Sequence, residues 1–294
     1  MYYNDKPYNI PNFIVVGAAK SGTTSLYQYL KQHNDIYMSF RKEIMFFDLN
    51  YYKGLEYYAK YFKGYNGEKA IGDISPSYMC DSNVPRRIAK ILPKTKIIFL
   101  LRNPIDRIYS HYWDLVCWKI IKSDFRDAIH QSAIWKKSYG YLEYDILEMG
   151  LYYKYINKYR EYYSDDDIGV FLYDDMCEDV YAFMDKIFDF LNISKRVEID
   201  LSDKVNQKRQ HKNQILSKIL VSERLREYVV SNMNEKTIKK LRKIYDNILS
   251  INTEKIKVEE IDDADKSFLL NFYKSDIEKL SCYLNRDLTQ WLNI

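Results

Sequence analysis

The chain has 294 residues, of which 47% are hydrophobic and 29% charged, and its formal net charge is +4. This composition is typical of a globular protein with a sizeable core, and it excludes a disordered chain. The net charge is too small to indicate a nucleic-acid-binding protein, although it suits a local basic pocket for an anion. The four cysteines form no C-x-x-C pair, no apolar run reaches the ~20 residues of a membrane span, and the N-terminus lacks a signal-peptide pattern. We therefore expect a cytoplasmic protein with reduced thiols.

Short apolar runs alternate with segments of helical periodicity along the first two thirds of the chain. Strands are predicted at 13–18, 69–75, 96–104 and 168–176, and helices at 23–33, 84–93, 105–116 and 180–193. Such alternation predicts a three-layer α/β fold with a central, mostly parallel sheet flanked by helices. We expect one domain over residues 1–294, with a nucleotide-binding core at about 11–193 and a helical C-terminal region at about 206–294.

A glycine-containing loop follows the first strand. Gly17 and Gly22 allow a sharp turn and the close approach of a ligand, and the backbone amides after Lys20 open a helix whose dipole favours an anion. Lys20 adds a positive charge, and Ser21, Thr23, Thr24 and Ser25 add hydroxyl groups. A Walker A loop carries lysine where this chain has Thr23. The loop therefore predicts an anion site that differs from one for a β,γ-phosphate pair.

A second anion site is predicted after the strand at 96–104. Arg102 lies at the carboxyl end of that strand, where open parallel sheets bind ligands. Ser110 follows about two helical turns later. A bidentate arginine and a hydroxyl group can bind one phosphate together. Taken alone, Arg102 fits better as a surface arginine between a strand and a helix cap, and only together with the first loop does it favour a phosphate site.

Two anion sites at two strand ends suit a nucleotide that is phosphorylated at both ends. The segment AAKSGTTSL (18–26) resembles the 5′-phosphosulfate loop of sulfotransferases that use 3′-phosphoadenosine 5′-phosphosulfate (PAPS), and LRNPIDRIYSHYW (101–113) resembles their 3′-phosphate motif. QHNDIYMSFRKEIMFFD (32–48) resembles the segment with the catalytic glutamate in the heparan-sulfate-type branch, where K-E-x-x-F-F is typical. Ile44 stands where that branch often has proline. Ala19 stands directly before the loop lysine, where proline is also frequent. The resemblance covers residues 11–193 and implies a P-loop-like fold.

The resemblance also implies roles for individual residues. Lys20 would contact the 5′-phosphate and the sulfuryl group, and Ser21, Gly22, Thr23, Thr24 and Ser25 would surround the phosphosulfate. Arg102 and Ser110 would hold the 3′-phosphate. Glu43 would take the proton from the acceptor hydroxyl, and Lys42 would bind acceptor or sulfuryl oxygens. No metal is expected, because lysine and amides can stabilise the transferred charge.

Other polar residues are less specific candidates. His111 is an alternative base, but it points about 100° away from Ser110 on the helix, which favours a structural or acceptor-side role. Asp73 could position an acceptor or a lysine, and Tyr78, Tyr112 and Tyr152 could shape the acceptor cleft. Lys208 and Arg209 belong either to a basic loop over the 3′-phosphate or adenine, or to a solvated charge run.

The expected function is therefore sulfuryl transfer from PAPS to an acceptor hydroxyl, which leaves 3′-phosphoadenosine 5′-phosphate (PAP). The K-E-x-x-F-F segment favours a carbohydrate acceptor, and the hydroxyl or amine of a small-molecule natural product is the alternative. A P-loop kinase or a nucleotide-binding regulator is the alternative from a different class. The expected partners are the nucleotide co-substrate and the acceptor, with no nucleic acid.

Overall fold

A five-stranded parallel sheet forms the centre of the fold in the computed structural model. The structure describes residues 2–3, 6–118, 120–121, 123–130, 145–194, 198–201, 209–211, 253–255 and 259–293, with single residues and pairs between 229 and 248. The sheet has the order β4 (Ile36–Met38), β5 (Ala70–Ile74), β3 (Phe13–Gly17), β6 (Lys96–Leu101) and β7 (Ile168–Leu172). Every residue of β3 is buried, as its unbroken apolar sequence predicts for a central parallel strand.

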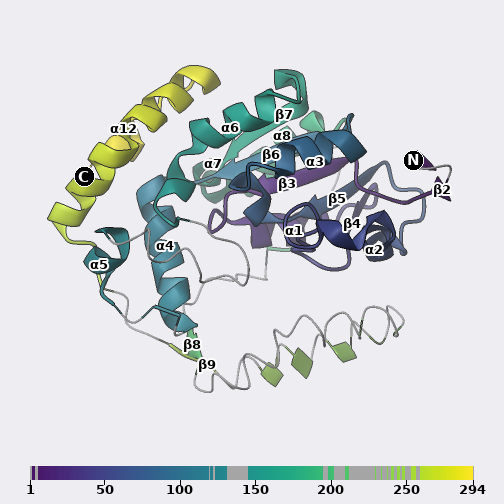
Figure 1. Ribbon diagram of the computed structural model, residues 1–294, viewed down its shortest axis with the longest axis horizontal. Coiled ribbons are helices and arrows are strands. Elements are labelled where there is room, and N and C mark those ends of the chain that lie inside the picture. The colour runs from purple at the N-terminus through teal and green to yellow at the C-terminus, as the bar shows by residue number, and fades with distance from the viewer. Residues whose placement is uncertain are drawn as a thin grey trace.

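Helices cover both faces of this sheet (Figure 1). Alternate residues of β3 point to opposite faces, so that Ile14 and Val16 belong to one apolar cluster and Phe13 and Val15 to the other. The first cluster includes residues of α3 (Val84–Ile91), α4 (Pro104–Cys117) and α6 (Tyr152–Arg160), and the second includes residues of α1 (Thr23–Leu30) and α8 (Val180–Phe190). This arrangement confirms the expected three-layer α/β fold of the P-loop-like kind.

Smaller elements complete the described part of the chain. They are β1 (Tyr2–Tyr3), β2 (Lys6–Pro7), η1 (Tyr51–Lys53), α2 (Leu55–Ala59), η2 (Lys60–Phe62), η3 (Pro76–Met79), α5 (Phe125–His130), η5 (Glu148–Gly150), η6 (Asp165–Asp167), α7 (Tyr173–Glu178), β8 (Arg209–His211), β9 (Thr253–Lys255), α12 (Asp263–Leu284) and η7 (Thr289–Leu292). The long helix α12 lies alongside α6, on the side of the molecule away from the N-terminus (Figure 1). No helix in these described ranges is both long and apolar enough to cross a membrane.

The four predicted strands and four predicted helices are all present, with shifted ends. The strand expected at 168–176 ends at Leu172, because Tyr173 begins the short helix α7. The sequence did not predict β4, whose three residues are too few for a recognisable alternation. Helix α12 agrees with the expected helical C-terminal region, but that region also contains β8 and β9, which pair in antiparallel fashion.

Candidate active site

The carboxyl ends of the five strands lie at one edge of the sheet, because all five run in parallel. The glycine loop follows the central strand β3, and Arg102 follows its neighbour β6. Open parallel sheets bind ligands at this edge. The two predicted anion sites therefore share one side of the molecule.

Gly22 caps helix α1 and has a φ of 89°, a conformation that favours glycine. A Cβ atom at this position would lie 2.7 Å from the ring of Tyr173 and 2.7 Å from Met176 Cε. The glycine is thus required both by the backbone conformation and by the close packing of the loop against α7. The hydroxyl-bearing residues differ in access, since Ser21 and Thr23 are buried whereas Thr24 is exposed and Ser25 half-buried.

Lys20 extends from the glycine loop toward helix α4. Its Nζ lies 3.1 Å from Asp114 Oδ1. Its charge also lowers the pKa values of Glu43 and His111, so it lies close to both. Lys20 therefore joins three segments of the site that are far apart in the sequence.

Glu43 lies at the same edge of the sheet, in the segment after β4. Its backbone N–H donates to Ile74 O at 2.8 Å, which ties it to the end of β5, and its side chain pairs directly with Lys42. Burial acts to raise the pKa of the Glu43 carboxyl, but the charges of Lys42, Lys20 and Arg41 and the hydrogen bond from Lys42 outweigh burial and lower it. Glu43 is therefore ionised at neutral pH, and its side chain is 41% exposed. The structure thus brings together Lys20, Lys42 and Glu43, three residues to which the resemblance assigns roles.

Asp73 is fully buried on β5 and accepts three hydrogen bonds from hydroxyl groups. Its Oδ2 accepts from Tyr58 at 3.0 Å and from Tyr78 at 3.2 Å, and its Oδ1 accepts from Ser75 at 3.2 Å. Burial outweighs these three donors and raises the pKa of Asp73 to about 7.

Two of these hydroxyl groups also accept hydrogen bonds from the backbone of the segment after Glu43. The Tyr78 hydroxyl accepts from Phe46 N at 2.7 Å, and Ser75 Oγ accepts from Met45 N at 3.3 Å. Tyr78, like Asp73, has no exposed surface. The expectations that Asp73 positions an acceptor or a lysine and that Tyr78 shapes the acceptor cleft are therefore corrected: their polar atoms are engaged inside the protein, where they hold the Glu43 segment in place.

Arg102 directly follows β6, and Asn103 separates it from helix α4. Asn103 caps this helix by accepting a hydrogen bond from Ile105 N at 2.9 Å, which fixes the direction of the chain after Arg102. The guanidinium of Arg102 lies 5.1 Å from the ring centre of Tyr173, and its Nε is buried with no hydrogen-bond partner among the described residues. Tyr173 thus contacts Arg102 and also limits the space at Gly22, so one ring adjoins both predicted anion sites.

Ser110 lies on α4 and is half-buried. It precedes Asp114 by four residues and so lies on the side of the helix that meets Lys20. The strand β8, which begins at Arg209, lies beside α4 (Figure 1). The side chain of Arg209 is not described, and Lys208 lies outside the described residues.

His111 is buried and interacts with a buried arginine. Its Nδ1 lies 3.3 Å from Arg107 Nη1, and because a guanidinium can only donate, Nδ1 accepts and the ring proton resides on Nε2. Burial, Arg107 and Lys20 lower the pKa of His111 well below its ordinary value. A neutral, buried and weakly basic imidazole favours the structural role that the sequence left open.

The two remaining tyrosines expected near the acceptor have other partners. Tyr112 donates to Ser123 O at 3.0 Å and lines a cavity outside the site around Lys20. Tyr152 is fully buried and donates to Arg102 O at 2.7 Å, so that it supports Arg102 from below the surface.

Sequence reasoning missed the C-terminal residues that support this site. Arg286 makes a bidentate pair with Asp175 at 2.5 and 2.7 Å, and Trp291 Nε1 donates to Asp174 Oδ2 at 2.7 Å. Both aspartates lie on α7, next to Tyr173. Asp114 was also missed, although its position four residues after Ser110 could have indicated it. Nothing in the local sequence connects the C-terminal residues to α7.

Comparisons with known proteins give the family and the fold of the chain. A family model described as the sulfotransferase domain matches residues 11–260. The chain is 40% identical over 133 residues to the membrane-associated sulfotransferase kil1 of Dictyostelium discoideum. The aligned region covers 42% of this chain and 28% of that protein. It is 30% identical over 199 residues to the human bifunctional heparan sulfate N-deacetylase/N-sulfotransferase 2, and this alignment covers 63% of this chain and 22% of that protein. The chain thus matches less than a third of the length of these two relatives.

A solved structure gives the same picture of the fold. The crystal structure of a sulfotransferase from Alicyclobacillus acidocaldarius matches with a TM-score of 0.73 and 24% identity, over 97% of this chain and 100% of that chain. At this identity the likeness concerns the fold. Because the sulfotransferase family model extends over most of its length, the chain belongs to the sulfotransferase family.

Proposed function

We propose that the chain transfers the sulfuryl group of PAPS to a hydroxyl group of a carbohydrate acceptor, with Glu43 as the general base. The observation that carries this proposal is the meeting of Lys20, Lys42 and ionised Glu43 at the carboxyl edge of the sheet, beside a glycine loop. This arrangement provides an anion site and a proton acceptor in one place, which are the two requirements of sulfuryl transfer to an alcohol.

The residues of the two anion sites fit a donor with phosphate at both ends. Gly22 leaves no room for a side chain where the loop turns, and Arg102 Nε is buried without a hydrogen-bond partner in the described part of the chain. PAPS supplies the sulfuryl group, and PAP leaves with the bridging oxygen on its 5′-phosphate. The loop amides, Thr24 and Ser25 bind the 5′ end, and Arg102 and Ser110 bind the 3′-phosphate.

Lys20 and Lys42 act on the transferred group, and Glu43 acts on the acceptor. Lys20 stabilises the negative charge that develops on the bridging oxygen, and Lys42 binds sulfuryl or acceptor oxygens. The carboxylate of Glu43 takes the hydroxyl proton. Because an anionic ligand shares the charges of both lysines, its binding raises the pKa of Glu43 from its lowered value and makes the carboxylate a stronger base.

The proposed acceptor class rests on sequence similarity. The K-E-x-x-F-F segment carries Glu43, and the human relative reported above is named a bifunctional heparan sulfate N-deacetylase/N-sulfotransferase, which supports a carbohydrate acceptor. The hydroxyl or amine of a small-molecule natural product is the alternative acceptor. Incubation with PAPS and a panel of carbohydrates and small molecules, followed by mass spectrometry, would distinguish the two through the mass gain of the acceptor.

The donor and the base can be tested separately. We expect PAP to raise the melting temperature and ATP with Mg²⁺ to leave it unchanged; the reverse would overturn the proposed donor. Glu43→Gln is expected to lower the rate of sulfuryl transfer by about 10²–10⁴-fold while the thermal shift with PAP persists. Glu198→Gln, at an exposed glutamate in the segment after α8, serves as the matched control. Full activity of Glu43→Gln would exclude Glu43 as the base.

A further inference from the structure

A cavity of about 910 Å³ lies between α4, α5 and the segment that leads into α12. This volume falls in the range of roughly 300–1,000 Å³ that is common for small-molecule sites. The cavity contains none of the residues to which the proposed transfer reaction assigns a role. Helix α4 presents Tyr109, Tyr112 and Trp113 to the cavity, whereas Asp114 on another side of the helix meets Lys20.

Aromatic rings form one wall of the cavity. Tyr112 lies 5.4 Å from Trp113 and 5.2 Å from Phe125, and Tyr109 lies 5.1 Å from Phe125, measured between ring centres. The rings pack edge to face, and the hydrogen bond from Tyr112 to Ser123 O fixes the end of one of them. Faces of aromatic rings carry partial negative charge and attract cations.

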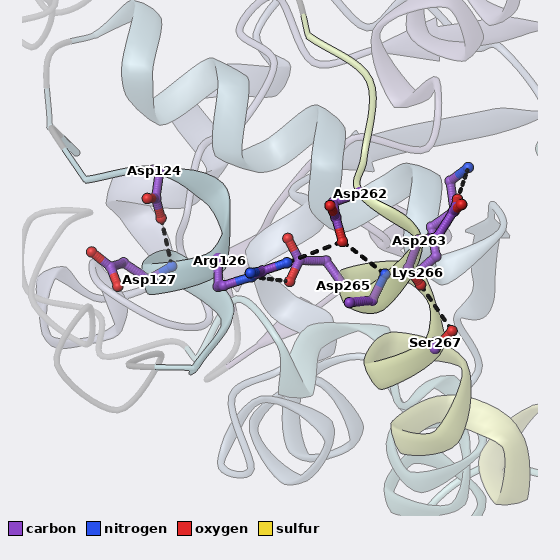
Figure 2. Close-up of polar contacts among 9 residues, drawn as sticks. Asp124, Arg126, Asp127, Asp262, Asp263, Asp265, Lys266 and Ser267 are labelled. Carbon is purple, nitrogen blue, oxygen red and sulfur yellow. Dashed lines mark hydrogen bonds and ion pairs between the residues drawn. The ribbon is translucent and has the colours of Figure 1, made fainter.

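Carboxylates surround these rings. The described lining contains five carboxylates, Asp124, Glu259, Glu260, Asp262 and Asp265, against a single guanidinium, that of Arg126. Figure 2 shows that Arg126 is already engaged, since its Nε lies 2.8 Å from Asp265 Oδ1 and its Nη2 lies 3.0 Å from Asp262 Oδ1. Glu259 and Glu260 are exposed and form no ion pair with any described residue.

Burial and the negative charge of the carboxylates raise the pKa values of the tyrosines in the aromatic wall. Burial, together with the charges of Glu259 and Glu260, raises the pKa of Tyr109. Burial also raises the pKa of Tyr112, with contributions from Asp124, Tyr109 and Glu259. The negative charge therefore extends over the rings, where it favours a positive ligand and disfavours an anion.

We propose that this cavity binds a small organic cation, an ammonium compound with an apolar or aromatic body. The aromatic wall packs against the body of the ligand, and the ring faces together with Glu259 and Glu260 attract its positive charge. Arg126 is held by Asp262 and Asp265, so it does not neutralise the remaining carboxylates. The proposal does not depend on the transfer reaction proposed above.

Three probes of similar size and different charge test this inference on the full chain. They are 2-phenylethylammonium, 2-phenylethanol and 3-phenylpropionate, whose dissociation constants can be measured by calorimetry at low salt. We expect the cation to bind more tightly than the neutral probe and the anion to bind most weakly. Equal affinity for the three probes, or no binding of the cation, would overturn the proposal.

Variants locate the bound cation. The double variant Glu259→Gln/Glu260→Gln is expected to weaken binding of the cation by about threefold to tenfold and to leave 2-phenylethanol unaffected. Trp113→Leu should weaken both probes. Glu278→Gln, at an exposed glutamate on the distant part of α12, is the matched control and should change neither. A double variant that keeps the full preference for the cation would contradict the assignment to this cavity.

The same variants separate this proposal from the proposed function. The thermal shift with PAP is expected to be unchanged in Glu259→Gln/Glu260→Gln. Binding of the cation in a protein that does not bind PAP would refute the proposed donor and leave the cavity assignment intact.

Discussion

Lys20 of the glycine loop forms an ion pair with Asp114 of α4, with 3.1 Å between Nζ and Oδ1. The lysine that the resemblance assigns to the sulfuryl group is thereby oriented by α4. The same helix carries Ser110 one turn before Asp114. Because Lys20 also lowers the pKa of Glu43, this pair helps to fix the distance between the donor site and the base.

Asp114→Asn tests whether this ion pair orients Lys20. We expect kcat to fall by about threefold to tenfold, because the lysine loses a fixed partner, while the dissociation constant of PAP stays nearly unchanged. Steady-state kinetics and PAP titration separate the two effects. Asp127→Asn on α5 is the control. An unchanged kcat would show that Asp114 does not position Lys20.

Lys42→Met tests the electrostatic control of Glu43. Lys42 is the strongest of the charges that lower the pKa of this carboxyl, so its removal raises that pKa. Activity requires the ionised carboxylate and is lost as pH falls through its pKa. The acidic limb of the kcat/KM profile is therefore expected to move to higher pH in the variant. Lys60→Met, at an exposed lysine, should leave the limb where it is; an unmoved limb in Lys42→Met would contradict the model of the base.

Gly22→Ala tests the close packing of the glycine loop against α7. Both Gly22 and Gly67 have positive φ values, of 89° and 97°, but only at Gly22 would a Cβ atom meet neighbouring atoms. Gly67→Ala is expected to cost about 1 kcal/mol of unfolding free energy from the backbone conformation alone. Gly22→Ala should cost more and also abolish the thermal shift with PAP. Equal losses of stability in the two variants would argue against steric restriction at the loop.

Asp73→Asn tests the buried carboxyl that supports the Glu43 segment. The pKa of Asp73 is raised to about 7 in the folded protein, so between its unfolded value and about 7 the folded state binds the extra proton. Asp73 ionisation therefore makes the free energy of unfolding decrease as pH rises through this window. The free energy of unfolding of the wild type minus that of Asp73→Asn should accordingly decrease from about pH 4 to about pH 7 and then level off. Urea unfolding at several pH values measures it, and a difference independent of pH would be the contrary result.

Arg286→Gln tests the contribution of the C-terminal residues to the donor site. Arg286 holds α7 through Asp175, and α7 carries the Tyr173 ring beside Arg102. We expect a loss of about 1 kcal/mol in stability together with weaker PAP binding. The matched control is Arg160→Gln, since Arg160 makes a similar bidentate pair with Asp165 away from the site. Its expected effect is on stability alone, and equal PAP affinity in both variants would refute the supporting role of the C-terminal residues.

The sequence by itself determined the elements and the chemistry that short segments carry. Hydrophobic periodicity marked the strands and helices around the loop, because each depends on residues within a few positions of one another. The positive φ at Gly22 and the placement of Arg102 after a parallel strand follow from equally local features. Lys20 and Glu43 were predicted through motifs whose spacing is contained in single segments.

Only the tertiary structure decided how these segments support one another. The contact between Asp175 and Arg286 joins residues 111 positions apart, and no local pattern encodes such a pairing. The same reason explains why Asp73 was expected to position an acceptor or a lysine: the sequence shows a carboxylate near the carboxyl end of a strand, whereas its burial under Tyr58 and Tyr78 depends on packing. Burial and ion pairing depend on contacts between segments that are distant in the sequence, and these contacts set the electrostatics of the site. The cavity lined by carboxylates likewise forms only where distant segments pack together.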